Sequence, residues 1–265
     1  MSIVIKPYSK DLIEAVIDFN ERLKKGGSTF RLPRSNIPEW LPKIENRKIY
    51  QEYLLAIQDN SIVRGGYCLK HQEFSFNGDI ITIGVPRFPL SEGIIDKTYN
   101  FVALQLLTDA LKRQPLLYGL GLGGKEEPIY KIYKALSWST ISIPFYFKVN
   151  HPVNFLRKIS YLRKKRFNKL MLDFLAITGF GFIVIKLIQF LLTNKENNKN
   201  SLSFEIVKTF STWTDELWEE CKTLFSMIAV RDSNVLNILY PSDNDKFIRL
   251  KISLKNCVIG WVVVL

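Results

Sequence analysis

Three apolar segments joined by two tight turns constrain the fold more than any other feature of the chain. Tyr53–Gln58 and Ile62–Leu69 are separated by Asp59-Asn60, and Asn77-Gly78 follows a few residues later. Asn-Gly between apolar segments is a strong hairpin signal, because both residues tolerate positive φ angles. A third strand is expected over Asp79–Val85. These signals predict an antiparallel meander.

Helix and strand patterns on both sides of the meander complete the predicted module. Apolar residues recur at helical spacing or form short continuous runs, and Gly or Pro residues separate them. In chain order we expect a strand over Ile3–Lys6, a helix over Leu12–Lys24, a loop over Phe30–Trp40, a loop over Pro86–Gly93, a helix over Ile95–Arg113, a strand over Leu116–Leu120, a helix over Glu127–Leu136 and a strand over Ile141–Val149. The predicted class is α+β, a three-layer arrangement with a mixed, mostly antiparallel central sheet flanked by helices.

Two segments of the chain resemble each other in the same order. Ser2–Leu23 and Ser203–Leu224 each combine a strand, a polar turn and an amphipathic helix. Ala56–Leu69 resembles Lys251–Leu265 when a gap of one residue is allowed. Any two hairpins look alike, which is the alternative explanation, but two matched segments in one order favour an internal repeat. The sequence therefore predicts a partial second copy of the first module.

The repeat suggests where the chain divides. A Gly-aromatic pair stands in each second hairpin strand, Gly66-Tyr67 in one copy and Gly260-Trp261 in the other. We expect one module over residues 1–150, a basic and apolar helical connector over 151–200, and the N-terminal part of a second module over 201–265. Ending on an apolar strand leaves an unpaired sheet edge, so we also expect this chain to be a fragment of a longer protein.

Charge and composition limit the classes of function. The formal net charge of +12 favours an anionic partner, and the alternative is a basic surface without a dedicated partner. Cysteine and histidine are too sparse and too widely spaced for a zinc site, a disulfide scaffold or a hydrolase triad. They comprise Cys68, Cys221, Cys257, His71 and His151. No metal is expected, and the absence of a signal-peptide pattern at the start makes a cytoplasmic location the default.

The segment Ile129–Trp138 carries a recognisable helix pattern. Acyl-CoA N-acyltransferases of the GNAT superfamily have a pattern like A-x-x-L-Y-E-K-L-G-F at this place. Ile132-Tyr133 stands for Leu-Tyr, Leu136 for the second Leu, and Ser137-Trp138 for Gly-Phe. The order of elements over Tyr53–Val149 also resembles this superfamily. The resemblance implies an acyl-CoA cosubstrate, acetyl-CoA or a longer acyl-CoA, and a primary amine as acceptor.

The resemblance also implies a cradle for the pyrophosphate of coenzyme A. In the superfamily, a loop of the form R/Q-x-x-G-x-G/A leads into a helix whose N-terminus attracts phosphate. The loop in this chain lacks the inner glycine, Pro89 removes an N–H donor, and Glu92 adds a negative charge. Glu126 stands where the superfamily often has Asn. The cofactor contacts implied are Arg87, Ser91, Gly93, Ile94 and Glu126.

Two residues are candidates for proton transfer. By resemblance, Tyr133 is the general acid that protonates the leaving thiolate, and the alternative is a tyrosine packed between helix and sheet. Glu73 is a weaker candidate for a general base, and the alternative is an exposed hairpin carboxylate. Gly119–Gly124 looks like a nucleotide-binding loop, but the acidic residues after it favour a strand–helix corner.

A basic and then apolar region lies between the two modules, over residues 154–192. Phe174–Leu192 spans 19 residues and contains Lys186 and Gln189. Three alternatives remain open: a helix packed between the modules, an in-plane contact with an anionic membrane surface, and a membrane-spanning helix. The basic run before it is more typical of a solvated face than of a nucleic-acid site, and no nucleic-acid partner is expected.

We therefore expect acyl transfer from acyl-CoA to an amine on a small or cell-envelope or polysaccharide-related acceptor. The tandem arrangement also resembles aminoacyl transferases of the Fem type, in which paired modules modify cell-wall precursors, and a lipid-linked acceptor would suit residues 154–192. Such an acceptor would place the protein at the inner membrane face. The alternative is a degenerate, non-catalytic module that acts as a scaffold or a membrane-surface adaptor for the second module.

Overall fold

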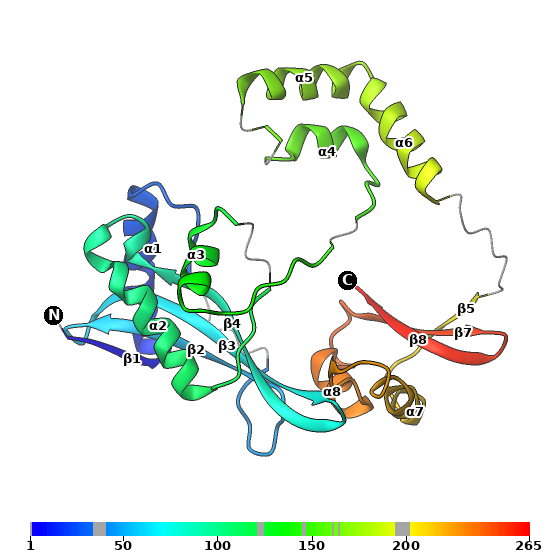
Figure 1. Cartoon of the computed structure of the whole chain (residues 1–265), viewed down its shortest axis with the longest axis horizontal. Coiled ribbons are helices and arrows are strands. Elements are labelled where there is room, and N and C mark those ends of the chain that lie inside the picture. Colours follow the sequence, from blue (N-terminus) through cyan, green and yellow to red (C-terminus); the bar gives the residue numbers. More distant parts are fainter. Residues whose placement is uncertain are drawn as a thin grey trace. The chain divides into compact units, whose positions relative to one another are not determined.

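The computed structural model describes residues 2–33, 41–120, 125–144, 147–160, 162–163, 165–193 and 202–265. Contacts between residues divide the chain into two compact units, Met1–Tyr130 together with Leu202–Leu265, and Lys131–Ser201. Figure 1 follows both units along the sequence, from blue to red. The first unit carries both sheets, and the candidate site is built on it.

The elements of residues 1–130 and the helix that follows are β1 (Ile3–Pro7), α1 (Ile13–Lys25), β2 (Tyr50–Gln58), β3 (Ile62–Phe76), β4 (Asp79–Ser91), α2 (Asn100–Arg113) and α3 (Pro128–Ala135). Later in the chain lie α4 (Pro152–Lys158), α5 (Arg166–Ile177), α6 (Phe180–Thr193), β5 (Leu202–Ile206), α7 (Thr212–Cys221), β6 (Met227–Ala229), α8 (Ser233–Leu239), β7 (Ile248–Leu254) and β8 (Cys257–Val264). Three short 3-10 helices cover Lys10–Leu12, Glu92–Ile94 and Lys97–Tyr99.

The larger sheet confirms the predicted meander. Its order is β1-β2-β3-β4, with antiparallel pairing throughout, and β6 pairs with the end of β3. Both predicted turns adopt positive φ angles, at Asp59-Asn60 and Asn77-Gly78. β3 continues to Phe76, beyond the predicted end at Leu69, because β4 and β6 pair with its last residues. The predicted α+β class is confirmed.

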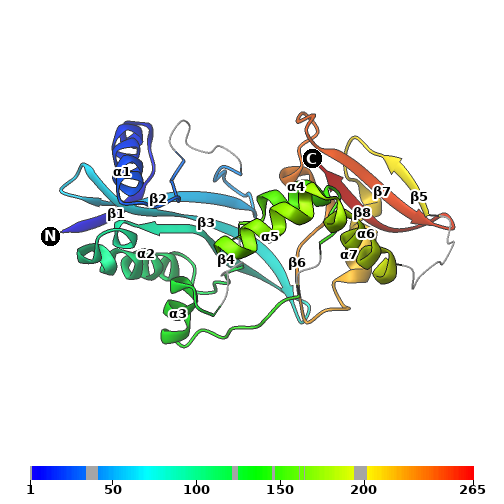
Figure 2. The same ribbon diagram turned by 90° about the horizontal axis from the view of Figure 1, so that it is seen from above.

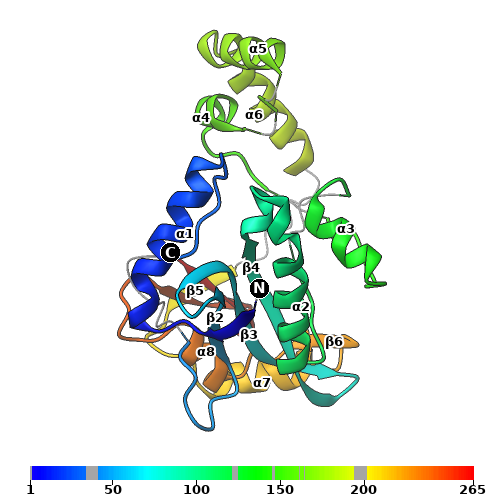
Figure 3. The same cartoon turned by 90° about the vertical axis from the view of Figure 1, so that its left-hand side faces the viewer.

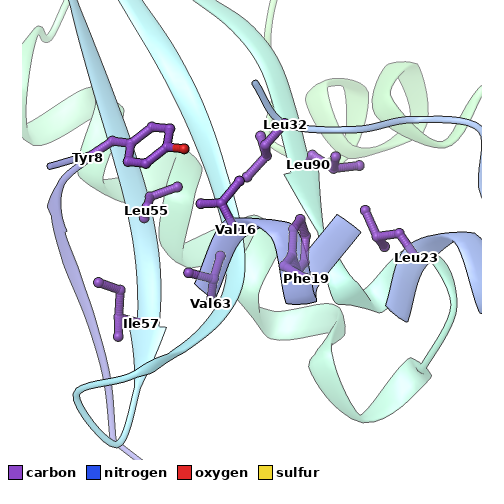
Figure 4. Close-up of a cluster of buried hydrophobic side chains, with 9 residues drawn as sticks. All are labelled: Tyr8, Val16, Phe19, Leu23, Leu32, Leu55, Ile57, Val63 and Leu90. Carbon is purple, nitrogen blue, oxygen red and sulfur yellow. The ribbon is translucent and has the colours of Figure 1, made fainter. Parts of the chain in front are cut away.

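The side chains of alternate residues of β2 lie on opposite faces of the sheet. Leu55 packs in one cluster with Val16 and Phe19 of α1, which Figure 4 shows. Leu54 packs in another cluster with Val102 of α2. Successive side chains of a strand point to opposite faces, so α1 and α2 cover opposite sides of the sheet, as Figures 2 and 3 show. Each helix buries its apolar stripe on its own face.

The predicted loop over Pro86–Gly93 is wrong for most of its length. β4 continues to Ser91, and the chain turns only from Glu92 onward. Proline disrupts a central strand because it has no N–H to donate to a neighbouring strand, but an edge strand tolerates it where that position faces away from the sheet. β4 lies at the edge of its sheet, which explains why Pro86 and Pro89 do not end it.

Two other predicted strands also differ from the structure. The strand expected over Leu116–Leu120 is reduced to one parallel bridge, between Leu117 and Gly84. The strand expected over Ile141–Val149 is wrong in its described part, where no strand forms and Ile141 is 86% exposed. An apolar run alone does not make a strand, because its backbone groups need a partner. Of the predicted loops, residues 34–40 and 121–124 lie outside the described residues.

The smaller sheet has the order β5-β7-β8 and is antiparallel. Its hairpin turns at Lys255-Asn256, both with positive φ angles, as Asp59-Asn60 have in the larger sheet. The strand register shifts between Ile252 and Ser253, and in the larger sheet it shifts between Ala56 and Ile57. Both shifts lie at the same distance before the turn. The two hairpins thus share turn conformation and the position of their irregularity.

Residues 131–201 form a helical unit that packs Leu156, Leu172 and Ala176 together. The apolar stretch predicted over Phe174–Leu192 is divided between α5 and α6 at Gly179, whose φ angle is +72°. In the part of the chain that is described, no single helix meets the length and hydropathy expected of a membrane span; α5 and Phe180–Leu191 meet them only as a pair bent by 84°.

Candidate active site

The candidate site is built on the outer edge of β4. The N–H of Gly84 donates to the carbonyl of Leu116 (2.8 Å), and the carbonyl of Gly84 accepts from the N–H of Tyr118 (3.0 Å). A Cβ at Gly84 would lie 2.6 Å from Cδ2 of Leu117, so glycine permits this close approach. In the described residues, this bridge is the only strand pairing on the outer edge of β4. Up to Leu120, where the described part of this segment ends, the two segments pair only at this bridge.

Beyond the bridge, the direction of each backbone group of β4 follows from alternation. Gly84 directs its N–H and carbonyl outward. By alternation, the N–H and carbonyl groups of Val85 and Arg87 are directed toward β3. The carbonyl of Pro86 and the N–H of Phe88 are directed outward. Pro86 offers a carbonyl but no N–H. The outer edge therefore presents a carbonyl at Pro86 and an N–H at Phe88.

β4 also carries a β-bulge at this point. Arg87 pairs with Cys68 and Leu90 pairs with Gly66, so Phe88 and Pro89 together stand opposite Tyr67 alone. A Cβ at Gly66 would lie 2.8 Å from the carbonyl oxygen of Leu54, which explains the glycine on the neighbouring strand. Bulges re-aim backbone groups and are frequent beside active sites.

Tyr67 ties the bulge to α2. Its hydroxyl donates to Oδ2 of Asp109 at 2.6 Å, and Asp109 also accepts from Nε of Arg113 at 2.7 Å. Burial raises the pKa of Tyr67, and the hydrogen bond to the Asp109 carboxylate raises it further. The hydroxyl thus remains a donor across the neutral pH range, and the bulge is fixed to the helix.

A buried carboxylate holds the turn that follows β4. Glu92 is 4% exposed, and its two oxygens accept from Nε of Arg22 (2.7 Å) and from Nη1 of Arg64 (2.8 Å). Burial alone would raise the pKa of Glu92, but the hydrogen bonds and charges of the two guanidinium groups lower it below its usual value. The negative charge expected beside a phosphate is therefore compensated inside the protein.

The chain enters α2 through a capped turn. The carbonyl of Glu92 accepts from the N–H groups of Ile95 (3.0 Å) and Asp96 (2.9 Å). The carboxylate of Asp96 accepts from the N–H of Thr98 (3.0 Å), as an N-cap residue does. The helix predicted to begin at Ile95 therefore begins at Asn100, after two 3-10 turns.

Gly93 is required by the same turn. A Cβ at this position would lie 2.9 Å from Cα of Asn100, a backbone atom that cannot rotate away. We expect Gly93→Ala to destabilise the protein by about 1–3 kcal/mol, because the turn must shift from α2. Gly260→Ala is the matched control, since a Cβ there meets nothing within 4 Å, and it should stay within about 0.5 kcal/mol. Urea denaturation measures both, and equal effects would contradict this account.

The structure brings together four of the predicted cofactor residues and separates one. Arg87 and Ser91 lie on β4, Gly93 follows in the turn, and Ile94 beside it is 52% exposed. They form one continuous segment along the bulge and the turn. Glu126 is exposed ahead of α3 and belongs to a different part of the chain.

Glu73 lies away from the bulge. It pairs with Thr82, on the other side of the Gly84 bridge, and roughly 20 Å of strand separates it from Tyr67. Its side chain is 16% exposed and forms an ion pair with Nζ of Lys48 at 3.3 Å. The structure therefore does not join Glu73 to the other predicted residues.

Tyr133 lies in α3 and is 3% exposed. Its ring stacks on Trp138, with centroids 4.5 Å apart and an angle of 18° between the rings. The N–H of Trp138 donates to the carbonyl of Tyr133 (3.0 Å), and Ser137 adopts a φ angle of +61°. Ser137 thus takes the left-handed conformation that glycine adopts most easily at the end of a helix. Burial raises the pKa of Tyr133, so its hydroxyl keeps its proton at neutral pH.

Several residues of the site escaped the sequence analysis. Arg22 and Glu92 are 70 positions apart, and no local pattern links them. Tyr67 was visible only as part of a Gly-aromatic pair, and the bulge opposite it depends on strand register. Within the described ranges, no group of three or more His, Cys, Asp or Glu side chains is placed to hold a metal ion.

No family model and no curated protein matches the chain. Among solved structures, a GNAT-family acetyltransferase from Staphylococcus aureus is similar, with 16% identity and a TM-score of 0.37, over 57% of this chain and 95% of that one. An aminoglycoside acetyltransferase from an uncultured soil metagenomic sample has 15% identity and a TM-score of 0.37, over 57% and 100%. A predicted acetyltransferase with acetyl-CoA from Clostridium acetobutylicum has 12% identity and a TM-score of 0.36, over 57% and 100%. At these values the likeness assigns no activity to this chain.

Proposed function

We propose that this chain is an N-acyltransferase that moves an acyl group from acetyl-CoA or another acyl-CoA to a primary amine. One observation carries the proposal: in the described residues, the outer edge of β4 pairs with its parallel neighbour only at the Gly84–Leu117 bridge, and a bulge follows in β4. An extended thioester arm with amide groups can pair with such an edge as a strand would. The carbonyl of Pro86 and the N–H of Phe88 are the groups that it would meet.

The chemistry then needs few side chains. The amine nitrogen attacks the thioester carbonyl carbon, while a backbone N–H stabilises the oxyanion; Phe88 is the residue we assign, since Pro89 has none. The carbon–sulfur bond breaks, the thiolate takes a proton from a general acid, and the new amide nitrogen loses a proton to solvent. The resemblance alone assigns the role of this acid to Tyr133. Positioning supplies much of the rate, because no covalent enzyme intermediate is required. Glu73 has no role in this sequence of steps.

The phosphates of the cosubstrate require positive potential. Arg87, the backbone of Ser91, Gly93 and Ile94, and the N-terminal end of α2 are the groups we assign to them. Neutralisation of Glu92 by two arginines supports this assignment, because it compensates a negative charge within this segment. The contact expected at Glu126 stays a prediction from the resemblance.

We further propose that Leu202–Leu265 is a partial second copy of the first module. The common order of strands, the positive-φ turns and the register shifts of the two hairpins support this. In that alignment Gly260 corresponds to Gly65, since these residues pair with Ile252 and Ala56. The Gly-aromatic match predicted from sequence is therefore displaced by one residue. The boundaries at 150 and 200 remain proposals.

Residues 154–192 suggest a second candidate function, that of a membrane-surface adaptor for a lipid-linked or cell-envelope acceptor. Basic residues precede large exposed apolar side chains on α5 and α6, such as Phe174 (65% exposed) and Ile188 (51% exposed). This combination is typical of helices that lie in the membrane interface. Co-sedimentation with vesicles that contain acidic phospholipid tests it. Binding that is absent, or equal with neutral vesicles, would oppose it.

Calorimetry and turnover test the main proposal. The chain should bind acetyl-CoA or a longer acyl-CoA and should release thiol when an amine acceptor is supplied. Binding without turnover over a broad set of amines would favour the degenerate scaffold, in which this module binds but does not react. No binding at near-millimolar ligand would refute the enzyme assignment.

A further inference from the structure

Basic residues gather on the sheet face that α1 also covers. Lys70 stands two residues along β3 from Cys68, which pairs with Arg87 of β4. Residues opposite each other in a sheet share a face, and so do residues two apart on one strand. Lys70 and Arg87 are therefore neighbours on the same face, next to the bulge.

The C-terminal part of the chain adds a third basic residue. β6 pairs with the end of β3, and the N–H of Val230 donates to the carbonyl of Glu73 at 3.0 Å. Arg231 follows directly and is half-buried. Burial, and then the charges of Arg231 and Arg87, lower the pKa of Lys70 to about 8. The charges of the two arginines thus act on Lys70 at a place where burial already disfavours its charged form.

Acidic partners do not explain the positions of Lys70 and Arg231. Over the described ranges, neither Lys70 nor Arg231 forms an ion pair with a carboxylate. Arg231 donates to the carbonyl of Val230 beside it (2.7 Å). Half-buried cations without acidic partners lower the stability of the folded protein, and a bound anion would offset this free-energy penalty.

Two buried amides point to the same kind of ligand. Gln51 pairs with Lys70 across the strands, and its Oε1 accepts from Cys68 Sγ (3.0 Å) and from the Tyr53 hydroxyl (3.2 Å). These two donors fix the orientation of the amide and leave Nε2 as its donor. Nε2 of Gln51 and Nε2 of Gln72 are buried without a hydrogen-bond partner, and the two residues are 6% and 2% exposed. Buried donors without partners need an explanation, and an anion supplies one.

We propose that Lys70 and Arg231, with the amides of Gln51 and Gln72, bind the anionic group of the acceptor, so that the acceptor is an amine that carries a phosphate or a carboxylate. The acceptor role rests on the proposed function, because it places the amine beside the bulge. The segment after β6 thereby contributes a substrate-binding residue to a site on the first module's sheet. Neutral amines should be poor acceptors.

The test uses the full chain saturated with coenzyme A, so that added anions do not report on the cosubstrate site. Glucosamine 6-phosphate, muramic acid and glucosamine serve as phosphate, carboxylate and neutral probes in calorimetry. At least one of the two anionic probes should bind about 10-fold more tightly than glucosamine, or more tightly still. The anionic probe that binds more tightly shows whether the site recognises a phosphate or a carboxylate. Equal affinity for all three probes would overturn the proposal.

Variants locate the site. Arg231→Gln and Lys70→Met should each lower the affinity for the anionic probe about 10- to 100-fold. The affinity for coenzyme A should stay within about twofold of the wild-type value. Lys246→Gln, an exposed change of the same charge, should alter neither affinity. Unchanged probe affinity in both site variants would overturn the proposal. If the wild-type chain does not bind coenzyme A, the proposed function is refuted. Tighter binding of an anionic probe than of glucosamine would then still support the anion site.

Discussion

Glu92→Gln should lower the free energy of unfolding by about 2–4 kcal/mol at pH 7, the largest stability effect that we expect from one charge. The side chain of Glu92 is 5% exposed, and its removal leaves two guanidinium groups without their carboxylate. Breaking a buried ion pair costs about 3–5 kcal/mol, and the partial exposure of Arg22 (32%) reduces this value. Glu21→Gln, at an exposed α1 ion pair, should change the stability by less than about 0.5 kcal/mol.

The pH dependence gives a signature of the same ion pair. Because the pKa of folded Glu92 is lowered, its stabilisation is fully present above the unfolded value of 4.5 and is lost as pH falls through the lower folded value. The difference between wild type and Glu92→Gln, measured by urea denaturation, should therefore shrink as pH falls below 4.5. Two results would contradict the role given to Glu92: a stability difference that does not change with pH, and equal stability of wild type and Glu92→Gln at pH 7.

Tyr133→Phe should lower kcat about 10²- to 10⁴-fold and leave the KM for acetyl-CoA nearly unchanged. The change removes only the hydroxyl that we propose as the proton donor to the leaving thiolate, and general acids contribute rate factors of this order. The stacking of the ring on Trp138 is kept, so the fold should not change.

The neighbouring Tyr130→Phe is the matched control, since it removes one hydroxyl from the same helix. Steady-state kinetics with both variants separates a specific proton donor from a general effect of the substitution. Equal kcat values in wild type and Tyr133→Phe would remove Tyr133 from the mechanism. Equal losses in both variants would also oppose its assignment as the acid.

Features that depend on local backbone conformation could be predicted from the sequence. Asp59-Asn60 and Asn77-Gly78 adopt positive φ angles because their residue types tolerate them, and these turns alone determine the meander. The helix pattern around Tyr133 was also readable, including Ser137 at a position that favours glycine. In each case the physical cause lies within a few residues of the feature.

Features that depend on distant partners could not be predicted. Pro86 and Pro89 indicate a loop in isolation, but β4 tolerates them because it is an edge strand. Ile141–Val149 has the composition of a strand, but its described residues pair with no other strand. The cations Lys70 and Arg231 are 161 positions apart in sequence and meet only through the pairing of β6 with β3. Strand register and sheet edges decide these cases, and neither is a local property.

Amide hydrogen exchange of β4, with and without saturating acetyl-CoA, tests the central claim most directly. The claim is that the thioester arm pairs with the outer edge of β4 beyond Gly84. Exchange at Phe88, whose N–H is directed outward, should slow when acetyl-CoA is bound, while Val85 and Arg87, directed toward β3, should not change. Saturated binding with unchanged exchange at Phe88 would contradict the claim.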